Sequence, residues 1–378
     1  MGTIRDKSNK KFMLLSAIGI FMVVDSHTWT AFNLFGDFIP YNSFFMPMFV
    51  FISGYFNKVD NDTGLGRYIL KKAKTLLLPY AGLSLLVFCL QWLINLIKLG
   101  ESVPPPPGYL MYVLQNVVTT GVSLNLCLPM WFVISLFALL VAYAVLKKFL
   151  YKVWNRYVML LLFTGLHIFA VFAGKYADPD FIAPLLTLLK CMFFLPFLEL
   201  GMLYRDKIEA KHSSMGGGAK IGLMAILLFI NTIRSLYLPM AYDMAFDSLD
   251  DLSGFTSPYL VTPLVSSLIG IAFWLTLVDL AGKPLYESRF INYMSCNTFW
   301  IMGLHITFFN ILNLILMGIN ENIAELPYFD TEYFLESEWY RWEMHPNFKM
   351  VYVLFGILGP LGLKLLWDKC KEKVTHRT

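Results

Sequence analysis

The sequence predicts an all-α protein, a polytopic membrane helical bundle with about ten transmembrane helices and both termini cytoplasmic. Hydrophobic residues make up 57% of its 378 residues and charged residues only 15%, against about 25% in ordinary soluble domains. The net charge of +4 follows from loop charges sorted by membrane side, so no nucleic-acid partner is expected. The five cysteines are scattered without a CxxC pair, and we therefore expect neither a disulfide framework nor a metal site.

Ten apolar segments have lengths suited to crossing a bilayer. The second is short and contains Pro47, and the ninth is long enough to be kinked or to extend beyond the bilayer. The segments are 12–34, 41–57, 76–98, 128–149, 157–175, 182–204, 219–238, 258–281, 290–318 and 348–367.

The loops between these segments set the orientation. Lysines and arginines gather in every second connection and in the C-terminal tail, whereas the opposite loops are acidic and hold almost no basic residues. The positive-inside rule then places both termini in the cytoplasm. The apolar stretch 109–122 is short, so we expect it to lie along the interface or to re-enter. No soluble segment is long enough for a second domain, and we interpret residues 1–378 as one transmembrane domain in the plasma membrane.

Few ionisable residues lie inside the predicted spans, and each is costly there. His27 lies 15 residues after Phe12, at a depth of about 22 Å if this segment enters as a helix. His305 lies 15 residues after Phe290, at about the same depth, so the two imidazoles are candidates for one shared cavity. The plainer interpretation gives each histidine an interhelical hydrogen bond. The other members of this set are Asp25, His167, Lys190 and Glu199.

Asp25 and His27 are two residues apart, so on a regular helix they point about 200° away from each other. We therefore expect Asp25 to hold a neighbouring helix, or to act through a second residue, rather than to orient His27 directly.

Five stretches together resemble the acyltransferase family 3 membrane proteins, which O-acylate sugars and other acceptors. Residues 21–27 (FMVVDSH) are similar to the family's apolar run into a catalytic histidine. Residues 47–56 (PMFVFISGYF) resemble its second-helix pattern, and residues 68–80 (YILKKAKTLLLPY) resemble the basic stretch that leads into Leu-Pro-Tyr. Residues 131–132 (WF) and 297–305 (NTFWIMGLH) are similar to the start of its fourth helix and to its late helix.

This resemblance implies a catalytic site around His27 as the general base, together with Asp25 and His305. The acyl donor implied is acetyl-CoA or another acyl-CoA, used as a substrate, and no bound cofactor is expected. The donor's phosphates are assigned to a basic group of Arg67, Lys71, Lys72 and Lys74, although positive-inside topology alone also explains that group. Ser53, Trp131 and Asn297 are assigned to substrate binding, with Ser53, Asn297 or His305 as donors to the oxyanion.

The sequence departs from the family pattern at Ser16. The pattern has arginine or lysine eleven residues before the histidine, and Ser16 occupies that position here. Lys10 and Lys11 are the nearest basic residues, five or six positions earlier.

We therefore predict a membrane O-acyltransferase, of the class that transfers groups other than aminoacyl groups. It modifies a hydroxyl of a cell-envelope glycan, such as a polysaccharide or lipid-linked saccharide, or of a small metabolite. Its partners are the lipid bilayer, the acyl-CoA and the hydroxyl acceptor, and the sequence is compatible with a homo-oligomer. Two other functions fit the same features: a transporter or flippase for a saccharide or small solute, and a non-catalytic membrane sensor of the same fold.

Overall fold

The computed structural model describes residues 7–28, 38–59, 64–99, 107–237, 260–336 and 344–375. Within these ranges the protein is built from helices and contains no strand, which confirms the predicted all-α class. The elements in order are α1 (Lys7–Ser26), η2 (Tyr41–Ser43), α2 (Phe45–Phe56), α3 (Leu65–Lys72), the π-helical η3 (Ala73–Leu77), α4 (Leu78–Leu99), α5 (Tyr109–Thr119), η4 (Asn125–Met130), α6 (Trp131–Phe149), η5 (Tyr151–Val153), α7 (Arg156–Tyr176), α8 (Pro179–Ile182), η6 (Ala183–Leu185), α9 (Leu186–Leu203), the π-helical η7 (Tyr204–Ile208), α10 (Glu209–Ser214), α11 (Gly217–Tyr237), α13 (Thr262–Ala281), η8 (Lys283–Leu285), α14 (Arg289–Cys296), α15 (Thr298–Asn322), α16 (Thr331–Glu336), η9 (Pro346–Phe348) and α17 (Lys349–Thr375).

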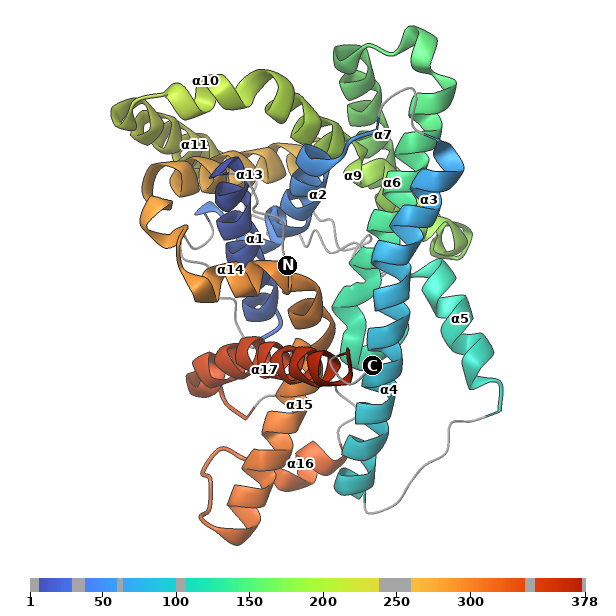
Figure 1. The fold of residues 1–378 in the computed structure, drawn as a ribbon, viewed down its shortest axis with the longest axis vertical. Helices are drawn as coiled ribbons and strands as arrows, with labels where there is room; N and C mark the ends of the chain where they lie inside the picture. Colours follow the sequence, from blue (N-terminus) through green and yellow to red (C-terminus); the bar gives the residue numbers. More distant parts are fainter. Residues whose placement is uncertain are drawn as a thin grey trace.

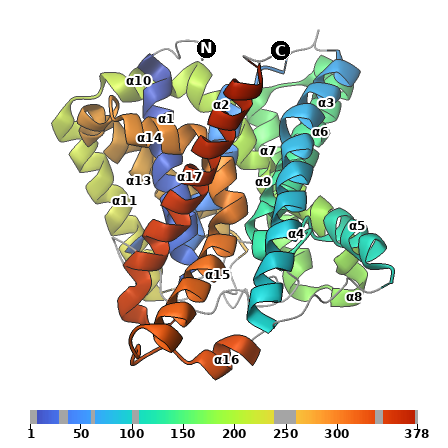
Figure 2. The ribbon, with the colours of Figure 1, turned by 60° about the horizontal axis from the view of Figure 1, so that its bottom comes forward.

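Eight helices among the described residues are long and apolar enough to cross a membrane. The two remaining predicted spans correspond to α1, whose sequence includes Lys10, Lys11 and Asp25, and to α2, which has only 12 residues. The multi-pass architecture is confirmed, while the count of about ten stays a prediction. α1 begins and α17 ends at the same end of the bundle (Figure 2), and the cytoplasmic orientation of that end remains predicted from the loop charges.

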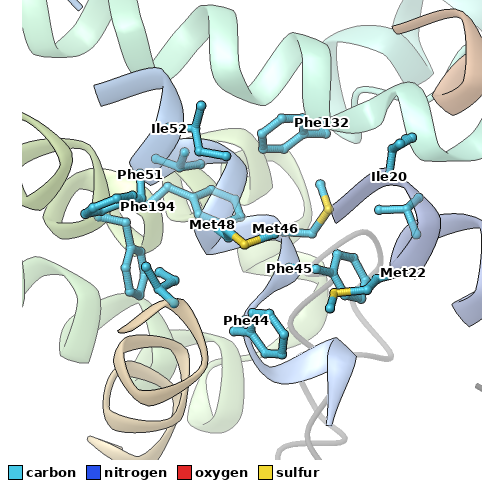
Figure 3. Packing of buried hydrophobic residues seen from close by; sticks show 14 of the residues in the cluster. Ile20, Met22, Phe44, Phe45, Met46, Met48, Phe51, Ile52, Phe132 and Phe194 are labelled. Carbon is cyan, nitrogen blue, oxygen red and sulfur yellow. The ribbon is translucent and has the colours of Figure 1, made fainter. Parts of the chain in front are cut away.

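The short helix α2 lies at the centre of the core. Nine of its 12 residues are buried, and Figure 3 shows its side chains between Ile20 of α1, Phe132 of α6 and Phe194 of α9. Because α2 is enclosed by other helices, it does not need the length of a lipid-facing span.

Two glycines allow α2 and α9 to cross with their backbones in contact. A Cβ atom on Gly54 would lie 2.1 Å from the carbonyl oxygen of Leu198, and one on Gly201 would lie 2.1 Å from the carbonyl oxygen of Phe51. Neither backbone oxygen can move without displacing its helix. This crossing therefore depends on glycine in both helices.

The predicted long ninth segment is broken into α14 and α15 at Asn297, where φ is −119° and ψ is 22°. α14 runs at a large angle to α15 (Figure 1). α17 then packs along α15, where the hydroxyl of Tyr352 donates to Oδ1 of Asn313 at 2.5 Å. The segment predicted at the interface or re-entering forms the short helix α5, which has no buried residue.

Candidate active site

His27 and His305 lie side by side. His27 is in the turn that follows α1, and His305 is within the first half of α15. Their ring centroids are 5.0 Å apart and the ring planes are inclined by 64°. His305 is fully buried and His27 is partly exposed. Two segments that are far apart in the chain thus bring two imidazole rings into contact.

The backbone fixes the same tautomer on both rings. Nδ1 of His27 lies 2.7 Å from the carbonyl oxygen of Val23, and Nδ1 of His305 lies 2.9 Å from that of Ile301. A carbonyl oxygen only accepts hydrogen bonds, so Nδ1 carries the hydrogen in each neutral ring and Nε2 keeps the lone pair. Nε2 of His305 is buried and has no hydrogen-bond partner among the described residues. A lone pair on an imidazole Nε2 can accept a proton from a hydroxyl group.

The break at Asn297 changes how His305 reaches this position. Counting 15 residues from Phe290 does not give its depth, because α15 begins only at Thr298. Short contacts with η4 place the helix: the Sδ of Met130 packs against Gly303, and Oγ1 of Thr307 donates to the carbonyl oxygen of Leu126 at 3.2 Å. These contacts lie two residues before and two residues after His305.

Asp25 is paired with a residue that the sequence analysis did not single out. Its Oδ1 lies 2.9 Å from Nζ of Lys349, the first residue of α17, and both side chains are buried. This agrees with the expectation that Asp25 holds a neighbouring helix, while its catalytic assignment stays a prediction. A signal for Lys349 exists in the sequence, since it follows a predominantly acidic segment whose other basic residue is Arg341.

The structure does not bring Ser53 or Asn297 to His27. Ser53 lies two residues before Tyr55, whose ring centroid is 3.9 Å from that of Phe12 in the first turns of α1. His27 is therefore about 20 Å away along the axis of α1. Asn297 lies at the helix break, where its Nδ2 donates to the carbonyl oxygen of Tyr293 at 2.8 Å. It precedes His305 by eight residues, which is about 12 Å along a helix axis.

Trp131 directly follows Met130 of η4, which packs on α15 at Gly303, two residues before His305. Its ring is buried under the ammonium group of Lys190, with Nζ 4.5 Å from the ring centroid. Lys190 also donates to the carbonyl oxygen of Thr120 at 2.6 Å. The buried lysine inside the predicted sixth span thus has both a cation–π and a hydrogen-bond partner.

The predicted donor-binding group lies at the other end of α1 from the histidines. Arg67, Lys71 and Lys74 are exposed and share one face of α3 and η3 by their helical spacing. Lys72 is half-buried, with Nζ 5.3 Å from the ring centroid of Tyr68.

The basic residues near Ser16 are already engaged. Ser16 itself donates its hydroxyl to the carbonyl oxygen of Phe12 at 2.8 Å. Lys10 pairs with Glu287. Lys11 is buried, and its Nζ lies 3.2 Å from Oε1 of Glu209 and 3.9 Å from Oδ1 of Asp279. These contacts join the start of α1 to neighbouring helices.

A family model described as an acyltransferase domain matches residues 14–329 of this chain. The matched range includes both histidines and ends before Lys349. No curated protein and no solved structure matches the chain.

Proposed function

The chain belongs to acyltransferase family 3, and from this premise we propose that it transfers an acetyl group from acetyl-CoA to a hydroxyl of a cell-envelope glycan, with His27 as general base. The observation that carries the proposal is the contact between His27 and His305, with ring centroids 5.0 Å apart. Burying two ionisable side chains inside a membrane bundle is energetically unfavourable. A role in taking the proton from a hydroxyl group would explain why both are present.

The proposed reaction uses the Nε2 lone pair of His27. As the acceptor oxygen attacks the thioester carbonyl carbon, Nε2 of His27 takes the hydroxyl proton. The tetrahedral intermediate then expels the sulfur of CoA, which receives the proton from the imidazolium. The products are the acetyl ester and CoA with a free thiol, so atoms and charge balance.

His305 is proposed to assist by position. A second imidazole in ring contact disfavours double protonation, because like charges at this separation repel. The lone pair on Nε2 of His305 is available to accept a hydrogen bond from the acceptor hydroxyl or from protonated His27. Asp25 is proposed as a positioning residue, since its ion pair with Lys349 fixes the end of α1 that carries His27.

Membranes that contain the protein, supplied with radiolabelled acetyl-CoA and a cell-envelope extract, test this proposal. The wild-type protein is expected to yield a labelled, base-labile ester, and His27→Ala is expected to reduce the rate by about 10²–10⁴-fold. His167→Ala is the matched control, because His167 is another histidine within a predicted span but its Nδ1 contacts the carbonyl oxygen of Phe193.

Two outcomes contradict the proposal. Near-normal transfer by a correctly inserted His27→Ala protein removes His27 as the base. Movement of a saccharide across reconstituted vesicles without any acylation assigns the fold to transport instead.

A further inference from the structure

A cavity of about 620 Å³ opens between the end of α2, the end of α6, the start of α7 and η7. It lies at the end of the bundle that the charge pattern predicts to be cytoplasmic. Four of its seven lining residues are cations, and none is acidic. The lining residues are Tyr55, Phe56, Lys58, Val59, Lys147, Arg156 and Arg205.

Two of these cations are held by neutral oxygens of the backbone. Nη1 of Arg205 donates to the carbonyl oxygens of Tyr55 and Asn57, each at 2.8 Å. Lys147 donates to the carbonyl oxygen of Val59. These acceptors include the last turn of α2, whose carbonyls have no partner within the helix. These carbonyl oxygens orient the two cations and carry no negative charge of their own.

Arg156 supplies an unsatisfied donor at the same site. Its Nη2 pairs with Oδ2 of Asp206 at 2.7 Å, and its Nε lies 3.9 Å from Oε1 of Glu199. Its Nη1 is buried and has no hydrogen-bond partner among the described residues. Arg205 also contacts Asp206, yet the four cations still outnumber these two carboxylates. A buried, unpartnered guanidinium nitrogen in an electropositive cavity favours an anionic ligand with several oxygens.

The size and the aromatic wall of the cavity favour a nucleotide over a simple phosphate. Its volume falls within the range of about 300–1,000 Å³ of small-molecule sites. Phe56 is 44% exposed, and an exposed aromatic ring offers a stacking surface for a base. We propose that this cavity binds the phosphorylated adenosine end of the acyl-CoA donor.

This assignment of the ligand rests on the proposed function. It moves the donor's phosphates from Arg67, Lys71 and Lys74, which are not among the lining residues. The cavity lies at the level of Tyr55, beside Phe12, and His27 is 15 residues further along the chain, about 22 Å for a helix. The long, thin pantetheine arm suits that separation between phosphates and thioester.

Calorimetric titration of the purified full-length protein with adenosine 3′,5′-bisphosphate tests the site without requiring turnover. Lys58→Gln and Lys147→Gln are each expected to weaken binding about tenfold, the loss of one charge-assisted contact. Lys58 is exposed, so its substitution does not disturb packing. Lys148→Gln and Lys152→Gln remove equivalent exposed charges outside the cavity and are expected to bind normally.

Separate titrations with inorganic phosphate and with short-chain phosphatidylglycerol distinguish the sources of phosphate. Either ligand binding as tightly as the bisphosphate overturns the nucleotide assignment, and so does equal weakening in the control variants. His27→Ala is expected to bind the bisphosphate normally. Loss of transfer therefore reports on the proposed function, while loss of binding in Lys58→Gln reports on the cavity.

Discussion

Lys349 and Asp25 form a buried ion pair, with 2.9 Å between Nζ and Oδ1, that ties the end of α1 to the start of α17. α17 packs along α15, and α15 carries His305. The pair therefore fixes the two segments that bring His27 and His305 together. Both partners are buried, so removal of either one takes the opposite charge away from a buried ion, which is expected to cost more than removal of both.

Asp25→Asn and Lys349→Met should each destabilise the protein by about 3–5 kcal/mol, since each removes the ion-pair partner of a buried charge. The double variant should recover much of this loss, because neither charge remains. The midpoint of thermal unfolding in detergent, measured for the two single variants and the double variant, gives the interaction energy. Additive losses in the double variant would show that the two residues act independently.

The chemical role of His305 can be tested separately from its contribution to packing. We expect His305→Phe to lower kcat by about 10²-fold, because Phe retains ring volume beside Phe309 but removes the Nε2 lone pair. Acetyl transfer and thermal unfolding should be measured together, with His167→Phe as the control. If His305→Phe transfers acetyl at the wild-type rate, His305 contributes only packing.

Much of the fold followed from the sequence because membrane spans and charged loops carry strong signals. The all-α class and the family are confirmed, and of the two alternatives for the long ninth segment the structure shows the kink. α2 was recognised as short, and burial by other helices explains why 12 residues suffice. Asp25 and His27 have different partners, Lys349 and His305, as expected if Asp25 does not orient His27 directly, although His27 lies in the turn after α1 and not on the regular helix.

Contacts between distant segments could not be derived in the same way. A sequence does not show which lysine turns inward, so the pairing of Lys349 with Asp25 could not be predicted. The assignment of Arg67, Lys71, Lys72 and Lys74 to the donor's phosphates rests on one basic stretch of the sequence and stays a prediction. The cationic cavity instead gathers Lys58, Lys147, Arg156 and Arg205 from three regions of the chain, namely the end of α2, the α6–α7 connection with its flanking turns, and η7. Hydropathy and spacing do not encode that convergence.

The close crossing of α2 and α9 predicts that the effect of a glycine-to-alanine substitution on stability depends strongly on its position. Gly54→Ala and Gly201→Ala should each lower stability by about 1–3 kcal/mol or more, because the new methyl group would lie 2.1 Å from a backbone oxygen. Gly165→Ala, which meets no atom within 4 Å, should be neutral or slightly stabilising. The yield of monodisperse protein after extraction and the unfolding midpoint provide the comparison. Equal behaviour of all three variants would mean that the helices do not cross this closely.

The two lysines near the start of α1 should behave very differently when their charge is removed. Lys11 is buried between Glu209 and Asp279 and donates to the hydroxyl of Tyr204 at 3.1 Å, so Lys11→Met should destabilise by about 3 kcal/mol or more.

Lys10 pairs with Glu287, whose side chain is 79% exposed, and Lys10→Met should cost at most about 1 kcal/mol. Neither substitution should change the affinity for adenosine 3′,5′-bisphosphate, because neither lysine lines the cationic cavity. Unfolding midpoints and calorimetric titration of both variants test this contrast. A weakened bisphosphate affinity in a stably folded Lys11→Met protein would show that Lys11 serves the donor, in place of the basic residue that Ser16 replaces.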